Sequence, residues 1–132
     1  DCMTSPLQTL TAYNDALAAG DMDAFAALLA PEIVWHQPGA HPLSGDHTGP
    51  AAVLELLGAM MGHSAGTFQV APTDAPRVNG DLVALPVSFS GKHEGRADLE
   101  MAGTDLFRIS GGLIREVWLF SADQDVEDAF WA

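Results

Sequence analysis

The chain has 132 residues, about the length of one average domain, and 48% of them are hydrophobic, which is enough for a sizeable core. Eighteen acidic residues against five Lys and Arg give a formal net charge of −13. Nucleic acids and anionic membrane surfaces both bind clustered basic side chains, so this composition argues against both classes of partner.

Cysteine usage and hydropathy indicate the compartment in which the protein works. A single cysteine, Cys2, cannot form a disulfide within the chain, and its place near the N-terminus argues against a nucleophilic role. No basic segment followed by an apolar one opens the sequence, and no apolar stretch approaches the ~20 residues that cross a membrane. We therefore expect a single cytoplasmic domain spanning residues 1–132.

The first half of the sequence predicts mainly helices. Ser5, Pro6 and Gln8 have the order of a helix start, with a capping Ser, a Pro in the first turn and a Gln three residues after the cap. Apolar residues then recur at helical spacing. The elements expected in this half are helices over 6–20, 21–29 and 51–61, a short strand over 33–37 and a loop over 38–49.

The second half predicts strands separated by turns. The strands are expected over 67–70, 82–90, 96–109 and 113–120, with a possible helical turn over 123–131. Helices followed by a run of strands predict an α+β fold in which a curved antiparallel sheet wraps around the helices. The mouth of such a cone is a natural pocket for a small molecule.

Several segments resemble the bacterial ketosteroid isomerases in their order and spacing. They are Tyr13, Ala16–Asp21, Ser44–Gly45, Val87–Phe89 and an Asp-x-Phe-Arg motif at Asp105–Arg108. Through these segments the chain resembles the nuclear transport factor 2-like superfamily, which also includes the SnoaL-like polyketide cyclases. It implies their cone-shaped, cystatin-like α+β fold, a hydrophobic pocket, no cofactor and a homodimer formed through the outer face of the sheet.

The resemblance also implies roles for single residues. Tyr13 matches the tyrosine of the isomerase oxyanion hole, and Asp105 matches the aspartic acid that stays protonated to donate a second hydrogen bond. Gln37 stands at the position of the general base. An amide cannot accept a proton at neutral pH, so the usual steroid isomerase route does not carry over to this chain.

Glu116 is a candidate for the missing base. The family match directs the face of the last strand that holds Glu116, Trp118 and Phe120 toward the pocket, beside Asp105. A carboxylate between aromatic side chains would have a raised pKa, so we expect Asp105 and Glu116 to form an acid–base pair that titrates high. The alternative is an outward Glu116 paired with a neighbouring arginine on the surface.

Other side chains of the expected pocket face could bind substrate. These are Trp35, Gln37, Phe89, Trp118 and Phe120. In the alternative interpretation the aromatic residues, Tyr13 included, are ordinary core, and Asp105 bonds to backbone groups. His41 and His47 are expected at the rim, and the acidic segment 123–128 is expected to be a solvated helix face. The five histidines show no metal-binding spacing, so no metal is expected.

Together these features predict a cofactor-free cyclase or isomerase that acts on a hydrophobic carbonyl compound resembling a polyketide, terpenoid or steroid. Tyr13 and Asp105 would polarise the substrate oxygen, and Glu116 would transfer the proton. One alternative is a non-catalytic binding domain for a lipophilic metabolite, which needs no ionising group. Another is an epoxide-opening hydrolase or cyclase that uses Asp105 and Glu116 together.

Overall fold

The computed structural model describes residues 4–132, so Cys2 lies outside the described residues. The elements in chain order are α1 (Pro6–Ala19), α2 (Met22–Ala27), β1 (Leu29–Gln37), β2 (Gly45–Thr48), α3 (Pro50–His63), β3 (Gln69–Pro72), β4 (Arg77–Asn79), β5 (Leu82–Gly91), β6 (Leu99–Ser110), β7 (Leu113–Ser121) and α4 (Gln124–Trp131). The fold is α+β, as expected. Two short strands, β2 and β4, lie in segments for which the sequence predicts no strand.

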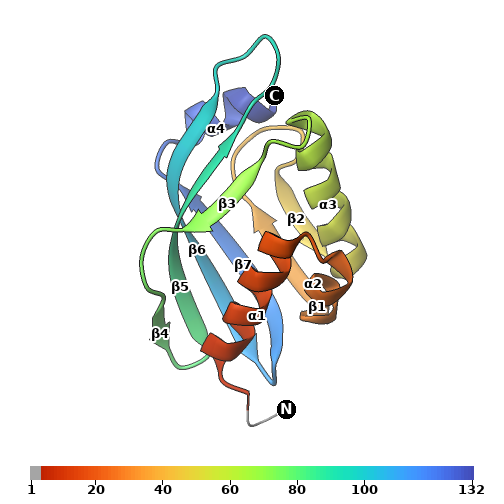
Figure 1. Cartoon of the computed structure of the whole chain (residues 1–132), viewed down its shortest axis with the longest axis vertical. Coiled ribbons are helices and arrows are strands. Elements are labelled where there is room, and N and C mark those ends of the chain that lie inside the picture. Colours follow the sequence, from red (N-terminus) through yellow and green to blue (C-terminus); the bar gives the residue numbers. More distant parts are fainter. Residues whose placement is uncertain (1–3) are drawn as a thin grey trace.

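The seven described strands form one curved sheet in the order β2-β1-β7-β6-β5-β3, and β4 also pairs with β5. In Figure 1, α1 and α3 lie against one side of this sheet, and α4 lies across one end of it. Neighbouring strands are antiparallel except for β1 and β7, which are parallel. The expectation of a purely antiparallel sheet is wrong for this pair, because a long connection through α3 and the other strands brings the chain back in the same direction.

Helix α1 begins as the sequence predicts. The Ser5 hydroxyl accepts a hydrogen bond from the Gln8 backbone N–H at 3.2 Å, and the Gln8 side chain accepts one from the Ser5 N–H at 2.7 Å. This capping box fixes the start of the helix, and Gly20 ends it with a left-handed φ of 67°. The helix consequently turns a fixed face inward, which carries Thr9, Leu10, Tyr13 and Ala16.

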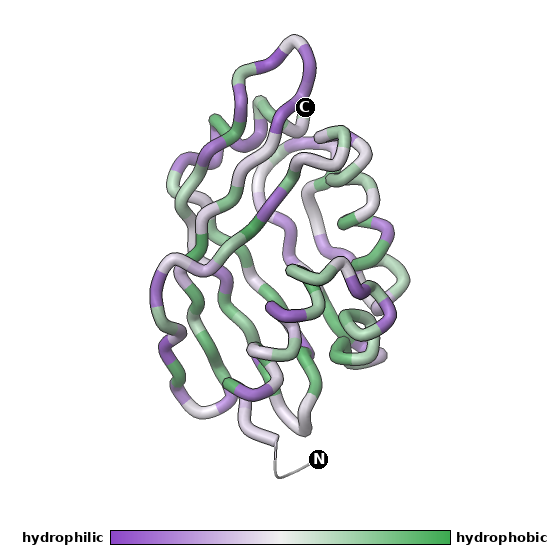
Figure 2. The backbone as a smooth tube through the Cα atoms, viewed as in Figure 1, coloured by the Kyte–Doolittle hydropathy of each residue, from purple (hydrophilic) through white to green (hydrophobic). Residues whose placement is uncertain are grey.

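The core lies between the helices and the concave face of the sheet. On β6 the odd-numbered residues face the core, and Met101 and Phe107 among them are buried, whereas Glu100 and Ala102 on the other face are exposed. Figure 2 shows this alternation as hydrophobic and hydrophilic residues that follow one another along the strands. In the described part of the chain, no helix is long and apolar enough to cross a membrane.

A β-bulge decides which residues of β7 face the core. Arg108 pairs with Glu116, but the next residue of β6, Ile109, pairs with Ile114. Between these two pairs β7 advances by two residues while β6 advances by one. The alternation of faces along β7 therefore shifts by one residue at this point. Ile114 is buried, whereas Glu116 lies on the convex face. Strict alternation along β7 would place these two residues on one face, and the bulge puts them on opposite faces.

Candidate functional site

Asp105 lies in the middle of β6 on the concave face. It pairs with Leu85 on β5 and Leu119 on β7, and its side chain is half-buried. Burial, and after it the negative charge of Glu127, raise the pKa of Asp105 to about 7. The prediction that this carboxyl titrates high is confirmed. Near neutral pH it is populated in both forms, so it can both accept and return a proton.

Tyr13 brings a neutral donor to the same face. Its side chain is 4% exposed, and its ring contacts those of Phe25 and Phe107, each with a centroid separation of 5.2 Å. Burial raises the pKa of the Tyr13 hydroxyl well above 10, and the charge of Asp105 raises it further. The hydroxyl therefore stays protonated at physiological pH and is available as a hydrogen-bond donor near Asp105.

The second carboxyl near Asp105 is Glu127 on α4. Its side chain is 5% exposed, and it accepts hydrogen bonds from Trp131 Nε1 at 3.1 Å and from Gln124 Nε2 at 3.3 Å. Burial raises the pKa of Glu127, and the hydrogen bond from Trp131 opposes that shift only in part. The negative charge of Glu127 in turn acts on Asp105. Glu127 is the group that the sequence interpretation missed.

The expectation that segment 123–128 is a solvated helix face is wrong for Glu127. Glu127, Phe130 and Trp131 are the buried residues of α4. They stand at positions i, i+3 and i+4, which share one side of a helix. That spacing was the available signal, because two aromatic residues on the same side as a glutamate mark the side that packs inward.

Glu116 lies on the convex face, and the predicted Asp105–Glu116 pair does not form. Glu116 Oε2 accepts a hydrogen bond from His36 Nε2 at 2.6 Å, and Oε1 accepts one from Arg108 at 3.3 Å. These two partners, His36 first, lower the pKa of Glu116. The prediction of a raised pKa is wrong, and the alternative of an outward Glu116 paired with an arginine is confirmed.

Trp118 and Phe120 lie on this convex face as well. His36 also bonds to Asp46, with 2.7 Å between its Nδ1 and the carboxylate. Because two carboxylates flank the ring, the pKa of His36 is raised. Trp118 stacks on His36 with a centroid separation of 5.5 Å, and Phe120 is 56% exposed. The expectation that Trp118 and Phe120 line the pocket is wrong, because the strand beyond the bulge turns both outward.

Trp35, Gln37 and Phe89 lie on the concave side, as expected. Trp35 Nε1 donates to Gln37 Oε1 at 3.1 Å, and each of these two residues is 5% exposed. Phe89 is half-buried and borders Gly103, where an added Cβ would come within 2.9 Å of its ring. Gln37 is therefore a buried acceptor for Trp35 at the position where a general base was expected.

The two histidines expected at the rim differ. His47 donates to the Leu43 carbonyl at 2.9 Å and is half-buried. His41 is 8% exposed, so the rim position is wrong for it. Its Nδ1 accepts the Leu43 N–H at 3.1 Å, and its Nε2 has no hydrogen-bond partner within residues 4–132. Burial lowers the pKa of His41, and the ring therefore stays neutral.

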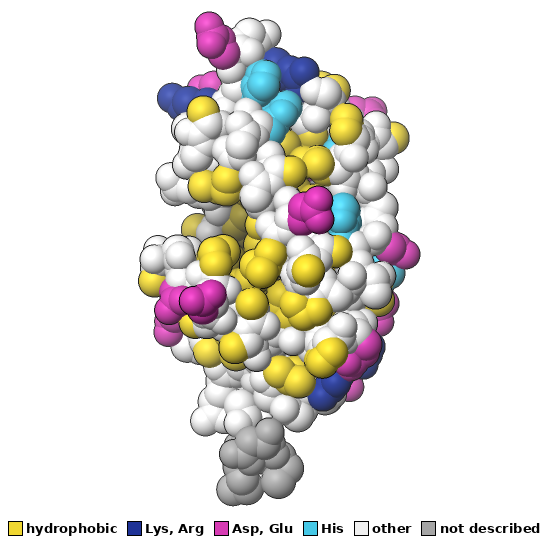
Figure 3. Space-filling view, turned by 90° about the vertical axis from the view of Figure 1, so that its right-hand side faces the viewer, with side chains coloured by type: hydrophobic (Ala, Val, Ile, Leu, Met, Phe, Trp, Pro, Cys, Tyr) yellow, Lys and Arg dark blue, Asp and Glu magenta, His cyan; other side chains and the backbone are white. Residues whose placement is uncertain are grey.

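Solvent reaches the centre of the concave face. Five residues that point inward there are half-buried, and together we call them the concave recess: Phe89, Gly103, Asp105, Leu119 and Ser121. Separately, Figure 3 shows hydrophobic side chains gathered around a hollow at the left edge of the face of the molecule that it draws. The recess thus combines an apolar lining with one carboxyl, and Tyr13 and Glu127 lie close enough to interact electrostatically with that carboxyl.

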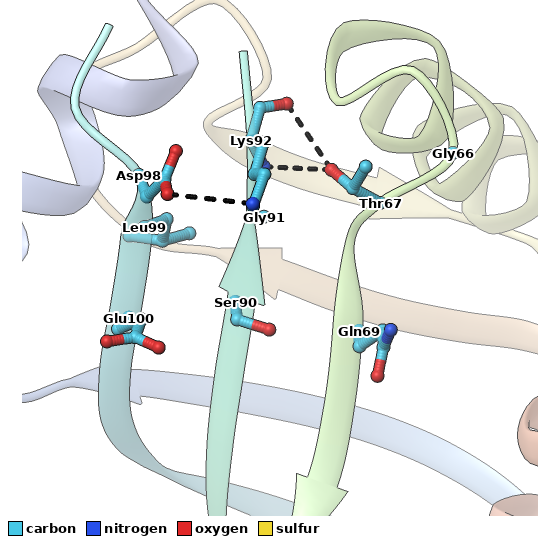
Figure 4. A pocket seen from close by; sticks show the side chains of 9 residues that line it. All are labelled: Gly66, Thr67, Gln69, Ser90, Gly91, Lys92, Asp98, Leu99 and Glu100. Carbon is cyan, nitrogen blue, oxygen red and sulfur yellow. Dashed lines mark hydrogen bonds and ion pairs between the residues drawn. The ribbon is translucent and has the colours of Figure 1, made fainter.

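Two shallow cavities lie elsewhere and contain none of the predicted site residues. One, of about 410 Å³, carries Gln69, Ser90 and Glu100 across the convex face of three strands, next to an ion pair of Lys92 and Asp98 at 4.0 Å (Figure 4). The other, of about 400 Å³, lies between the start of β6 and α4. Within residues 4–132, no cluster of three or more His, Cys, Asp or Glu side chains is arranged to hold a metal ion.

A family model described as a SnoaL-like domain matches residues 10–117. A protein of unknown function with a cystatin-like fold from Xanthomonas campestris is 43% identical, with a TM-score of 0.91 over 98% of this chain and 99% of that one. Bal32a, from a soil-derived mobile gene cassette, is 23% identical, with a TM-score of 0.89 over 96% of each chain.

IdmH, a proposed polyketide cyclase from Streptomyces antibioticus, is 23% identical, with a TM-score of 0.73 over 90% of this chain and 93% of that one. At these identities Bal32a and IdmH support the fold alone. No curated protein is significantly similar in sequence.

Proposed function

Because the chain belongs to the SnoaL-like domain family, within the nuclear transport factor 2-like superfamily, we propose that it is an acid–base enzyme of the cyclase or isomerase type. Its substrate would be a hydrophobic small molecule that carries a carbonyl group. The observation that carries the proposal is Asp105, a carboxyl with a pKa of about 7 in an apolar recess beside the protonated hydroxyl of Tyr13. IdmH, a fold relative, is a proposed polyketide cyclase, which agrees with this class of reaction.

In this proposal Asp105 is the proton carrier. Its ionised form takes a proton from the carbon next to the substrate carbonyl, so the C–H bond breaks and its electron pair moves to the carbonyl oxygen. The Tyr13 hydroxyl donates a hydrogen bond to that oxygen as its negative charge develops. Asp105 then returns the proton to another carbon in an isomerisation. In a cyclisation the enolate carbon attacks a second carbonyl carbon of the same substrate, the π electrons of that carbonyl move to its oxygen, and Asp105 gives the proton to the alkoxide formed there.

Proton exchange on a simple ketone tests this function. We expect the protein to accelerate exchange of the α-protons of 2-tetralone in D₂O, followed by proton NMR, with a rate that depends on an ionisation near pH 7. Asp105→Asn should lose about 10²–10⁴-fold, the range typical for removal of a general base. Glu116→Gln, a matched removal of a carboxylate on the convex face, should stay within about twofold of the native rate. Native exchange in Asp105→Asn would exclude the mechanism.

The binding-domain alternative remains a second candidate because of Gln37. This residue stands where the family places a base, and its amide oxygen is already engaged by Trp35. A binding domain would hold 2-tetralone without exchanging its α-protons at any pH. The epoxide-opening alternative is not proposed, because Asp105 and Glu116 lie on opposite faces of the sheet.

The homodimer remains a proposal for the convex face. In the described chain α1 and α3 cover the concave side, and Trp118 and the 56% exposed Phe120 lie on the other. Exposed aromatic residues of this kind are common at interfaces between subunits. Sedimentation of the native protein should give the mass of two chains, and Phe120→Asp should give the mass of one.

A further inference from the structure

The interior of the cone lacks a basic counter-charge for its acidic groups. All five Lys and Arg side chains have partners outside the concave recess: Arg77 with Asp74, Lys92 with Asp98, Arg108 with Glu116, Arg115 with Glu32, and Arg96 with backbone carbonyls at the end of α4. These five are all the Lys and Arg residues of the chain. A permanent cation is therefore absent from the recess.

The groups that surround Asp105 and Glu127 add no positive charge. From α1, Tyr13 presents a protonated, neutral hydroxyl. From α4, Asp128 adds a negative charge beside Glu127, while Trp131 and Gln124 supply neutral N–H donors. His41, from the loop that follows β1, is buried and neutral. From α3, His63 packs on Trp131 with a centroid separation of 5.3 Å, and its Nε2 bonds to the Phe130 carbonyl at 2.6 Å. When the two carboxyls ionise, no Lys or Arg side chain lies in the recess to offset their charge.

We propose that the concave recess accepts uncharged lipophilic ligands and rejects anionic ones, and that Glu127 is a specificity-determining residue for this selection. The inference rests on the proposed function, because it describes the substrate class of the same site. An anionic ligand would lie near two carboxylates in a partly desolvated space, where repulsion between like charges is much stronger than in water. Carboxylate, phosphate and sulfate compounds are thus excluded, whereas ketones, aldehydes and esters are accepted.

Glu127 is suited to this role because it is held in place. Two hydrogen bonds and nearly complete burial fix its carboxyl on the inner side of α4. Asp105 is needed for proton transfer in the proposed mechanism, whereas Glu127 acts on ligand and Asp105 only through its charge. A Glu127→Gln substitution removes that charge and keeps an oxygen that can accept from Trp131.

Two probes with one ring system test the selection. We would measure Kd at pH 8 for 2-acetylnaphthalene, an uncharged ketone, and for 2-naphthoate, its anionic counterpart. The native protein should bind the ketone at least about tenfold more tightly. Glu127→Gln should lower the Kd for naphthoate about tenfold and leave the Kd for the ketone within about twofold of the native value. Asp125→Asn, which removes an exposed carboxylate from the same helix, should change neither.

The pH dependence gives a second measurement that needs no variant. Naphthoate affinity for the native protein should rise as the pH is lowered from 8 to 6, by close to tenfold per unit above pH 7 and by less below it. Protonation of Asp105 removes one of the two negative charges that the anion meets, while ketone affinity stays nearly flat. Equal binding of both probes, a flat naphthoate profile, or a folded Glu127→Gln protein with unchanged naphthoate affinity would overturn the inference and leave the proposed function standing. Failure of the native protein to bind the ketone would instead overturn the proposed function, and the inference with it.

Discussion

The two faces of the central sheet hold two carboxyls in opposite states. Asp105 on the concave face of β6 has a pKa raised to about 7, whereas Glu116 on the convex face of the neighbouring strand has a lowered pKa. Both are acidic side chains in the same sheet, so residue type does not explain the difference. Asp105 lies among apolar side chains and close to a second carboxyl, whereas Glu116 lies between His36 and Arg108. The face that a carboxyl occupies decides its chemistry.

Of the substitutions that distinguish the two faces, the one at Asp105 should change the free energy of unfolding most. Asp105 has a higher pKa in the folded than in the unfolded protein, so the stability linked to it is present at low pH and is lost as pH rises from about 4 to about 7. Asp105→Asn should therefore raise the free energy of unfolding at pH 8 by about 4 kcal/mol, and by little at pH 4. Urea unfolding at both pH values measures this. A variant less stable than the native protein at pH 8 would contradict it.

A smaller effect is expected from crowding the concave face. At Gly103, an added Cβ would lie 2.5 Å from the Phe120 carbonyl oxygen and 2.9 Å from the Phe89 ring. The nearer contact is with backbone, which cannot rotate away, so Gly103→Ala should cost about 1–3 kcal/mol of stability. Gly58→Ala is the control, because nothing lies within 4 Å of a Cβ there. Equal stability of the two variants would show that the backbone around Gly103 can move to make room for the added methyl group.

The smallest effect is expected on the convex face. Glu116 has a lowered pKa, so its contribution is present above its unfolded pKa and is lost as pH falls through the folded one. The Glu116 side chain is 24% exposed, and that of its partner Arg108 is 39% exposed, which limits the value of the pair. Glu116→Gln should cost below about 1 kcal/mol at pH 7, and salt should reduce this cost. A loss of several kcal/mol in urea unfolding would refute the surface assignment.

The fold and half of the site could be predicted from the sequence. Local signals such as the capping box at Ser5 and Gln8 depend on neighbouring residues, and they were sufficient to orient Tyr13. Asp105 was found through an ordered motif, and its raised pKa follows from the apolar face on which it lies. These features depend on short-range order in the chain.

The other half could not be predicted because it depends on a single irregular residue pair and on tertiary packing. The bulge opposite Arg108 reverses the faces of β7, and alternation by itself cannot reveal it. The choice between Glu116 and Glu127 follows from that reversal and from the packing of α4 against the open end of the sheet. In the sequence, the spacing of Glu127 to Phe130 and Trp131 was the only local indication.

The most direct test is a carbon-13 NMR titration of the side-chain carboxyls in the native protein. Asp105 should titrate near pH 7, Glu127 above its ordinary range, and Glu116 below its own. In Glu127→Gln, Asp105 should titrate at a lower pH, because a neighbouring negative charge is gone. An Asp105 carboxyl that titrates near pH 4, or a Glu116 carboxyl that titrates above its ordinary range, would contradict the assignment of the concave face as the site of acid–base chemistry.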